Sequence, residues 1–118
     1  MKLDLKRVLE QLEVFGYPIF SLDINKDELL EHKSFFIYDD NTGITPGENR
    51  LQYQIGFSLL FVTFEEAQID QIEVALQLSR AGLIFDNSTH DIGKLQDTDQ
   101  VATTITWQFH SLVRAMIK

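Results

Sequence analysis

Two long stretches of alternating apolar and polar residues constrain the fold of this chain most strongly. Residues 51–64 and 100–113 each run for 14 residues, whereas a β-strand is usually about five to six residues long. Successive side chains of a strand point to opposite faces of a sheet. The sequence therefore predicts two long strands, each with one buried face. The residues predicted on those faces are Leu51, Tyr53, Ile55, Phe57, Leu59 and Phe61, and Val101, Thr103, Ile105, Trp107, Phe109 and Val113.

Apolar residues at helical spacing predict a helix near the start of the chain. Leu5, Val8 and Leu12 fall on one face of a 3.6-residue period. Gly16 is placed to end this helix in a left-handed conformation, and Pro18 prevents its continuation.

A second helix is predicted after the first long strand. Thr63 and Glu66 have the spacing of a capping box, in which each side chain satisfies a backbone N–H of the first helical turn. From this start, the periodicity places Ile69, Ile72 and Leu76 on the buried stripe, and Gly82 ends the helix.

The remaining segments predict short strands and loops. Residues 34–38 favour a strand, residues 39–50 form a long polar loop, residues 83–85 form a short strand and residues 86–99 a second polar loop. Residues 19–33 suggest an extended piece and a short helical turn. We expect a single domain, residues 1–118. Its predicted fold class is α+β, a two-layer sandwich of a four-stranded antiparallel sheet with two helices on one face, in the order α-β-β-α-β-β.

Composition narrows the function classes. The chain has 10 basic and 18 acidic residues, a net charge of -8, which repels the phosphates of nucleic acids. The basic residues do not cluster in the sequence, so we expect no sequence-specific nucleic acid binding. The most apolar window, residues 57–64, is shorter than the roughly 18 residues of a membrane-spanning helix, so we expect no membrane partner. Because cysteine is absent, disulfides and thiolate metal sites are excluded.

No motif in the chain predicts catalysis or a cofactor. The histidines, His32, His90 and His110, lack the spacing at which histidines converge on a metal. Asp86, His90 and Asp91 offer metal ligands within one polar stretch, but turns use the same residue types, and we interpret the stretch as a turn. The serines and glycines lack nucleophile and phosphate-binding motifs. We therefore predict no enzyme activity, no metal site and no cofactor.

The second half of the first long strand is apolar on both faces. Leu60, Val62 and Phe64 lie on the face opposite the predicted core. Either the first helix or residues 19–33 cover them, or they form a subunit interface, because contiguous exposed apolar surface usually marks a contact. The sequence leaves both alternatives open.

A pattern of strand residues and one loop extends over residues 34–112. Its members are Phe36, Ile37, Tyr38, Asp40, Thr42, Glu48, Asn49, Tyr53, Val62, Thr63, Ile69, Ile72, Glu73, Leu76, Ile105, Trp107 and Phe109. This pattern resembles the small tail completion proteins of long-tailed bacteriophages and prophages, also called tail terminators or tail-to-head joining proteins.

The resemblance implies a structural role in virion assembly. In that family, copies form a ring, usually of six, that caps the growing tail tube and later docks to the head connector. The implied partners are further copies of the chain, a tail tube protein and a head connector protein. The implied location is the head-tail junction of the virion, after assembly in the host cytoplasm. An acidic channel would also let DNA pass without binding it.

A head-to-tail ring needs two different surfaces on each subunit. The loop of residues 39–50 and the outer face of the long strand are the candidates for these surfaces. The predicted interface residues are Asp40, Asn41, Thr42, Glu48, Arg50, Leu60, Val62 and Phe64.

A protein of another class fits the same acidic surface and long loop. It is a monomeric adaptor or inhibitor that binds one protein partner, such as an immunity protein. The two hypotheses differ in whether the apolar outer half of the long strand is covered within the monomer.

Overall fold

The two alternating stretches form neighbouring strands at the centre of a sheet. The protein is described by a computed structural model that covers residues 4–29, 31–94 and 101–114. Strands β4 (Gln52–Thr63) and β6 (Val101–Arg114) run antiparallel, and their register extends from Gln52 opposite Arg114 to Thr63 opposite Thr103. These paired strands give the molecule its length, 54 Å against 28 and 22 Å in the other directions.

The other strands extend the sheet on both sides of this pair. β2 (Ser34–Asp39) and then β3 (Ile44–Pro46) pair antiparallel with the free edge of β4, while β5 (Ile84–Lys94) pairs antiparallel with β6. β1 (Ile19–Ser21) lies parallel to β2. The connection between these two parallel strands contains α2 (Lys26–Leu29), as parallel strands require a crossover. The strand order is β1-β2-β4-β6-β5.

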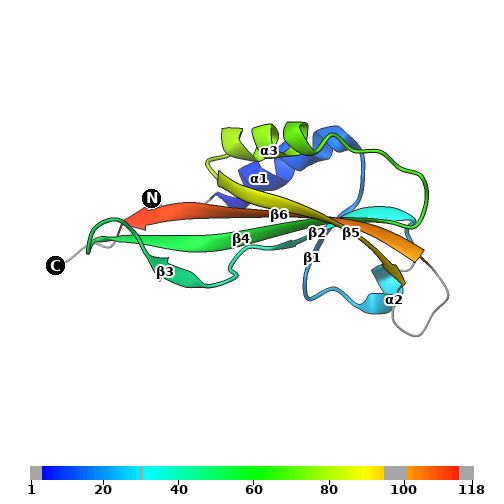
Figure 1. Ribbon diagram of the computed structural model, residues 1–118, viewed down its shortest axis with the longest axis horizontal. Helices are drawn as coiled ribbons and strands as arrows, with labels where there is room; N and C mark the ends of the chain where they lie inside the picture. The colour runs from blue at the N-terminus through cyan, green and yellow to red at the C-terminus, as the bar shows by residue number, and fades with distance from the viewer. Residues whose placement is uncertain (1–3, 30, 95–100, 115–118) are drawn as a thin grey trace.

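Helices α1 (Leu5–Leu12) and α3 (Gln71–Arg80) pack side by side on one face of the sheet (Figure 1). The Asp4 carboxylate accepts a hydrogen bond from the Arg7 N–H and caps α1. A 3₁₀ turn, η1 (Glu13–Phe15), follows, and Gly16 ends it with a φ of 78°. The predicted first helix and its glycine stop are thus confirmed.

The core lies between these helices and the middle of the sheet. Trp107 is fully buried, and its Nε1 donates a hydrogen bond to the Gln71 carbonyl oxygen at 3.1 Å. This bond fixes the start of α3 on β6. The core side chains around Trp107 are Val8, Leu12, Phe36, Phe57, Leu59, Phe61, Val74, Leu78 and Phe109.

The predicted fold class is wrong. In the described residues the sheet has six strands and is mixed, with one parallel pair, and the order is α-β-α-β-β-β-α-β-β rather than α-β-β-α-β-β. β1 and β3 are three residues each, too short to show an alternating pattern. β3 lies within the predicted loop of residues 39–50, where Pro46 at the free edge leaves no ladder hydrogen bond unmade.

The predicted polar loop of residues 86–99 is also wrong over its first half. β5 continues through this polar stretch to Lys94, with a bulge between Phe85 and Asn87. As the edge strand it is exposed along most of its length, so its stability does not depend on apolar side chains.

The second helix begins later than the capping box predicts. Thr63 is the last residue of β4, and its hydroxyl bonds Ser34 and accepts from the Glu65 N–H. Asp70 caps α3 instead, accepting from the backbone N–H groups of Ile72 and Glu73. The buried face of α3 carries Val74, Gln77 and Leu78. The predicted burial of Ile72 and Leu76 is therefore wrong, and these residues are 73% and 49% exposed.

Among the described residues, α1, α2 and α3 are all too short to cross a bilayer as an apolar helix.

Candidate interaction surfaces

The face of the sheet opposite α1 and α3, here called the outer face, changes from apolar to polar along its length. Directly paired residues of neighbouring strands share a face. Val62 pairs with Phe35 and Thr104, and Leu60 pairs with Ile37 and Thr106. Further along the same strands the outer residues are Ser58, Gln108, Gly56, His110, Gln54 and Leu112.

Residues 19–33 cover one corner of the apolar end. The rings of Phe20 and His32 lie 5.2 Å apart, Phe20 lies 6.1 Å from Phe35, and Phe35 lies 6.3 Å from Phe64. Phe35 is only 3% exposed as a result. The predicted interface residue Phe64 therefore packs partly within the chain, in this small aromatic cluster.

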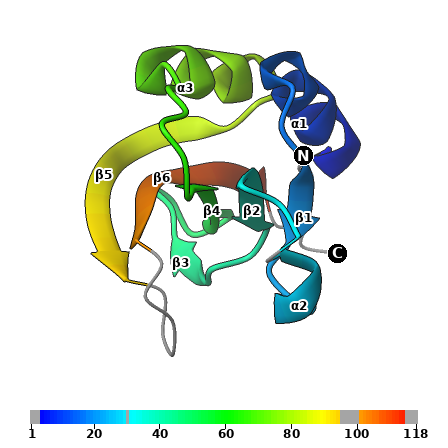
Figure 2. The ribbon, with the colours of Figure 1, turned by 90° about the vertical axis from the view of Figure 1, so that its right-hand side faces the viewer.

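Leu60 and Val62 lie beside that cluster and line a groove. Figure 2 shows β5 curving from beside α3 round towards the outer face, which makes this part of the sheet concave. The resulting cavity, here called the outer groove, has a volume of about 260 Å³. Its walls are Leu60 and Val62 from β4, Ala102 and Thr104 from β6, and residues 91–93 of β5. The chain covers part of its apolar outer face and leaves this part accessible.

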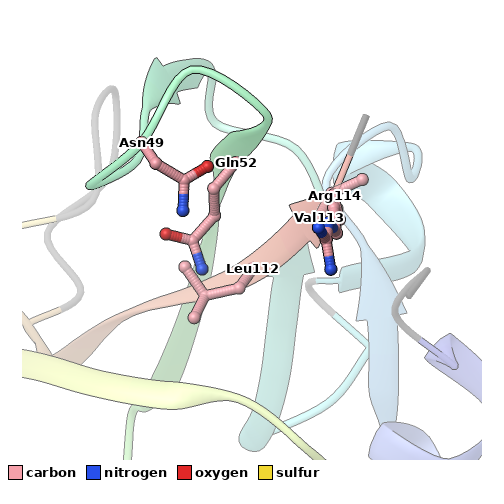
Figure 3. Close-up of a pocket in the computed structure, with 5 residues that line it drawn as sticks. All are labelled: Asn49, Gln52, Leu112, Val113 and Arg114. Atoms are coloured by element: carbon pink, nitrogen blue, oxygen red, sulfur yellow. The ribbon is translucent and has the colours of Figure 1, made fainter. Parts of the chain in front are cut away.

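The opposite end of the sheet forms an arm that α1 and α3 do not cover (Figure 1). This β-arm consists of β3, residues 47–55 and residues 111–114. It exposes apolar side chains on both faces: Ile44 is 62% exposed, Tyr53 40% and Leu112 38%. A shallow pocket of about 250 Å³ lies on it, between the amides of Asn49 and Gln52 and the last residues of β6, Leu112 to Arg114 (Figure 3).

The predicted loop residues lie beside the β-arm. Asp40, Asn41 and Thr42 form the tight connection from β2 to β3, in which the Asp39 carboxylate accepts from the Asn41 N–H. The Thr42 N–H donates to the Gly56 carbonyl, and the Gly56 N–H donates to the Gly43 carbonyl. These bonds hold the connection against β4. Glu48 and Arg50 are exposed at the tip of the arm.

A histidine and an aspartate that the sequence did not connect meet on the outer face. The Nδ1 atom of His110 lies 2.9 Å and 3.0 Å from the two carboxylate oxygens of Asp86, the residue at the β5 bulge. The side chains are 18% and 41% exposed. They border a cleft of about 240 Å³ with Thr42, Gln54 and Gln108.

The predicted turn around Asp86, His90 and Asp91 is a strand, so its side chains alternate. His90 pairs with Ile105 on the helix-covered face, whereas Asp91 pairs with Thr104 on the outer face. In the described part of the chain, no group of three or more His, Asp or Glu side chains is placed to hold a metal ion.

A third surface was missed by sequence reasoning because Ile72 and Leu76 were assigned to the buried face of α3. Ile72, Ala75 and Leu76 of α3 face Phe85 and Ser88 of β5 across an apolar groove of about 370 Å³, here called the α3–β5 groove. The signal available in the sequence was a second apolar pair at i, i+4 spacing, Val74 and Leu78, on another face of the same helix.

Glu48 and Arg50, at the tip of the β-arm, are far from the outer groove, whereas Asp40, Asn41 and Thr42 lie beside Gly56, four residues along β4 from Leu60. Ten residues of β4 separate Gln52 at the β-arm from Val62 in the outer groove, a distance of about 34 Å at the ~3.4 Å rise of an antiparallel strand. The structure therefore gives each copy two distinct surfaces at opposite ends of one sheet.

Comparison with known proteins assigns no family. A scan against protein-family models finds no match to the chain, and neither does a search of curated proteins. The surfaces described above therefore carry the functional argument.

Proposed function

We propose that this protein has a structural role in virion assembly, of the kind that its resemblance to phage tail terminators implies. In this role, copies join head to tail into a ring, most simply of six, at the head-proximal end of the tail tube. The ring then joins the tube to the head connector. The role requires no catalysed reaction and no cofactor, and it places the protein at the head-tail junction.

The observation that carries the proposal is the pair of distinct accessible surfaces at the two ends of β4. A ring built from one repeated contact is heterologous, so every copy must present two different patches. The β-arm and the outer groove meet this requirement. Their rigid connection through the paired strands β4 and β6 fixes the angle between them, as a ring of defined size requires.

Electron microscopy of tail tubes mixed with the purified protein tests this role. Tubes assembled from a tail tube protein of a long-tailed phage should gain a cap at one end only, and their further growth should stop. Uncapped tubes at saturating protein concentration, or binding along the tube wall, would contradict the proposal.

The α3–β5 groove favours a second candidate function, a monomeric adaptor or inhibitor. Ile72 and Leu76 form an apolar surface that the β-arm and the outer groove do not include, and such surfaces commonly bind proteins. An adaptor would stay monomeric at high concentration, and its binding to a partner would be lost on Leu76→Asp while Val62→Asp left it intact.

A further inference from the structure

The β-arm and the outer groove carry apolar surface and charges of opposite sign. The arm is a projection with exposed Ile44, Tyr53 and Leu112, and its exposed charged residues are Glu48, Arg50 and Arg114, a net charge of +1. Exposed apolar side chains on a projection are suited to fill an apolar groove, because burial of both surfaces is favourable.

The outer groove offers matching chemistry. Leu60 and Val62 form its apolar floor, and Ala102 and Thr104 of β6 lie beside them. Asp91 is the charged residue in its lining. Glu65 and Glu66 follow β4 directly and both are exposed, so the chain after β4 adds negative charge at this end of the sheet.

The arm cannot reach the groove of its own chain, because both belong to one continuous sheet, in which β4 holds Gln52 about 34 Å from Val62. The occupant of the groove is therefore a separate molecule. The arm of an identical copy combines the two required properties, since it exposes apolar residues and carries arginines. The contact is heterologous and leaves a free arm and a free groove for further copies.

We infer that the β-arm of one copy inserts into the outer groove of the next, with Arg50 and Arg114 directed towards Asp91. This inference rests on the proposed ring and specifies which surfaces form its repeated contact. Apolar burial supplies most of the affinity, because exposed ion pairs contribute little. The charges set the orientation of the arm in the groove and disfavour contacts in which groups of like charge would meet.

Charge reversal on each surface tests the inference. Asp91→Arg should block the groove, and the double variant Arg50→Asp/Arg114→Asp should block the arm. We expect each variant alone to associate at least about tenfold more weakly than the wild type, because like charges then face each other. The readout is the distribution of masses by mass photometry or sedimentation. Glu10→Arg is the matched control, since Glu10 is exposed on α1, on the opposite face, and its reversal should leave assembly unchanged.

A mixture of the two blocked variants provides the decisive observation. In the mixture, wild-type arms meet wild-type grooves and reversed arms meet reversed grooves, so assembly should recover although neither variant assembles alone. Assembly of Asp91→Arg at wild-type affinity, no recovery in the mixture, or a wild-type chain that stays monomeric at the highest concentration overturns the inference.

Failure of the arm-in-groove contact can be distinguished from failure of the proposed virion role. If wild-type protein caps tail tubes and Asp91→Arg caps them equally well, the function stands and the arm-in-groove contact is wrong. If the variants complement each other but the wild type caps no tubes, the contact stands and the virion role is wrong.

Discussion

At the residue scale, the absence of a side chain at Gly56 determines where the loop after β2 lies. A Cβ at this position would overlap the Thr42 hydroxyl. The close approach permits the two backbone hydrogen bonds that join Gly56 to Thr42 and Gly43. One glycine in the middle of a strand thus positions three of the predicted interface residues, Asp40, Asn41 and Thr42.

Gly56→Ala should therefore destabilise the protein by about 1–3 kcal/mol, as overpacking typically does. The loss should be largely recovered in the double variant Gly56→Ala/Thr42→Ala, because removal of the hydroxyl makes room for the new methyl group. Thermal and urea unfolding of the wild type, Gly56→Ala, Thr42→Ala and the double variant measure both effects. Equal stability of Gly56→Ala and wild type would mean that the loop does not rest on β4.

Phe57 and Tyr53 show what sequence periodicity predicts and where it fails. Both lie on the predicted inner face of β4, but Phe57 is fully buried and Tyr53 is 40% exposed. Alternation assigns a residue to a face of the sheet. It does not tell how far along the strand the helices extend, because that depends on the lengths and positions of α1 and α3.

Truncation of these two aromatic residues should have very different effects. Phe57→Ala should cost about 3–5 kcal/mol, because it leaves a cavity between β4 and the helices. Tyr53→Ala, on the same face of the same strand, should cost far less, since its ring is largely exposed in the monomer. Chemical denaturation provides both values. Similar losses would show that the arm is packed against the body.

At the element scale, the start of α3 depends on whether the Thr63 side chain caps a helix or bonds Ser34 of the neighbouring strand. The Ser34 hydroxyl lies 2.7 Å from the Thr63 hydroxyl and 3.0 Å from a Glu65 carboxylate oxygen. Thr63 is thus engaged by a residue 29 positions earlier, which a local motif cannot reveal. Asp70 caps the helix in its place.

Asp70→Ala should consequently lower the free energy of unfolding by about 1 kcal/mol, the usual cost of removing an N-cap. Asp70→Ser should retain most of the stability, because serine also caps helices. Glu66→Ala is the control that distinguishes the Asp70 cap from the predicted capping box at Thr63. If the capping box were present, the Glu66 side chain would stabilise the helix and its loss would destabilise the protein. A larger loss from Glu66→Ala than from Asp70→Ala would contradict the observed start of α3.

β5 shows why a polar strand escapes sequence-based prediction. The segment from Asp86 to Asp91 has the composition of a turn, and it forms a strand because β6 supplies a full ladder of backbone partners. The bulge near Asp86 and the pair between Asp86 and His110 depend on residues in two strands. Such long-range pairing is absent from any local window of the sequence.

At the scale of the whole molecule, the two long strands hold two unlike surfaces at a fixed separation. The sequence predicted interface residues in the loop and at Leu60, Val62 and Phe64, and their role stays a prediction. It did not predict the arm, because residues 39–50 were interpreted as a loop and Tyr53 was placed on the buried face. It could not predict that Phe64 packs against Phe35, because residues 19–33 have no strong periodicity. Nor could it predict the concave outer face, which results from the curvature of β5 (Figure 2).

Val62→Asp should abolish assembly and leave the fold intact, because Val62 is half-buried in the outer groove and outside the main core. Circular dichroism checks the fold, and sedimentation checks assembly. Val62→Thr should assemble normally, since it keeps the shape and matches the neighbouring Thr104. If Val62→Asp unfolds the chain, Thr104→Asp in the same groove must still block assembly for the account to hold.

The mass of the wild-type protein in solution, measured by sedimentation equilibrium over rising concentration, tests head-to-tail association most directly. Repeated joining of two different surfaces through a fixed angle predicts an oligomer larger than a dimer whose mass reaches a plateau as the ring closes. A complex that stops at two copies, as a two-fold symmetric contact would produce, or a chain that remains single at every concentration, would contradict the account.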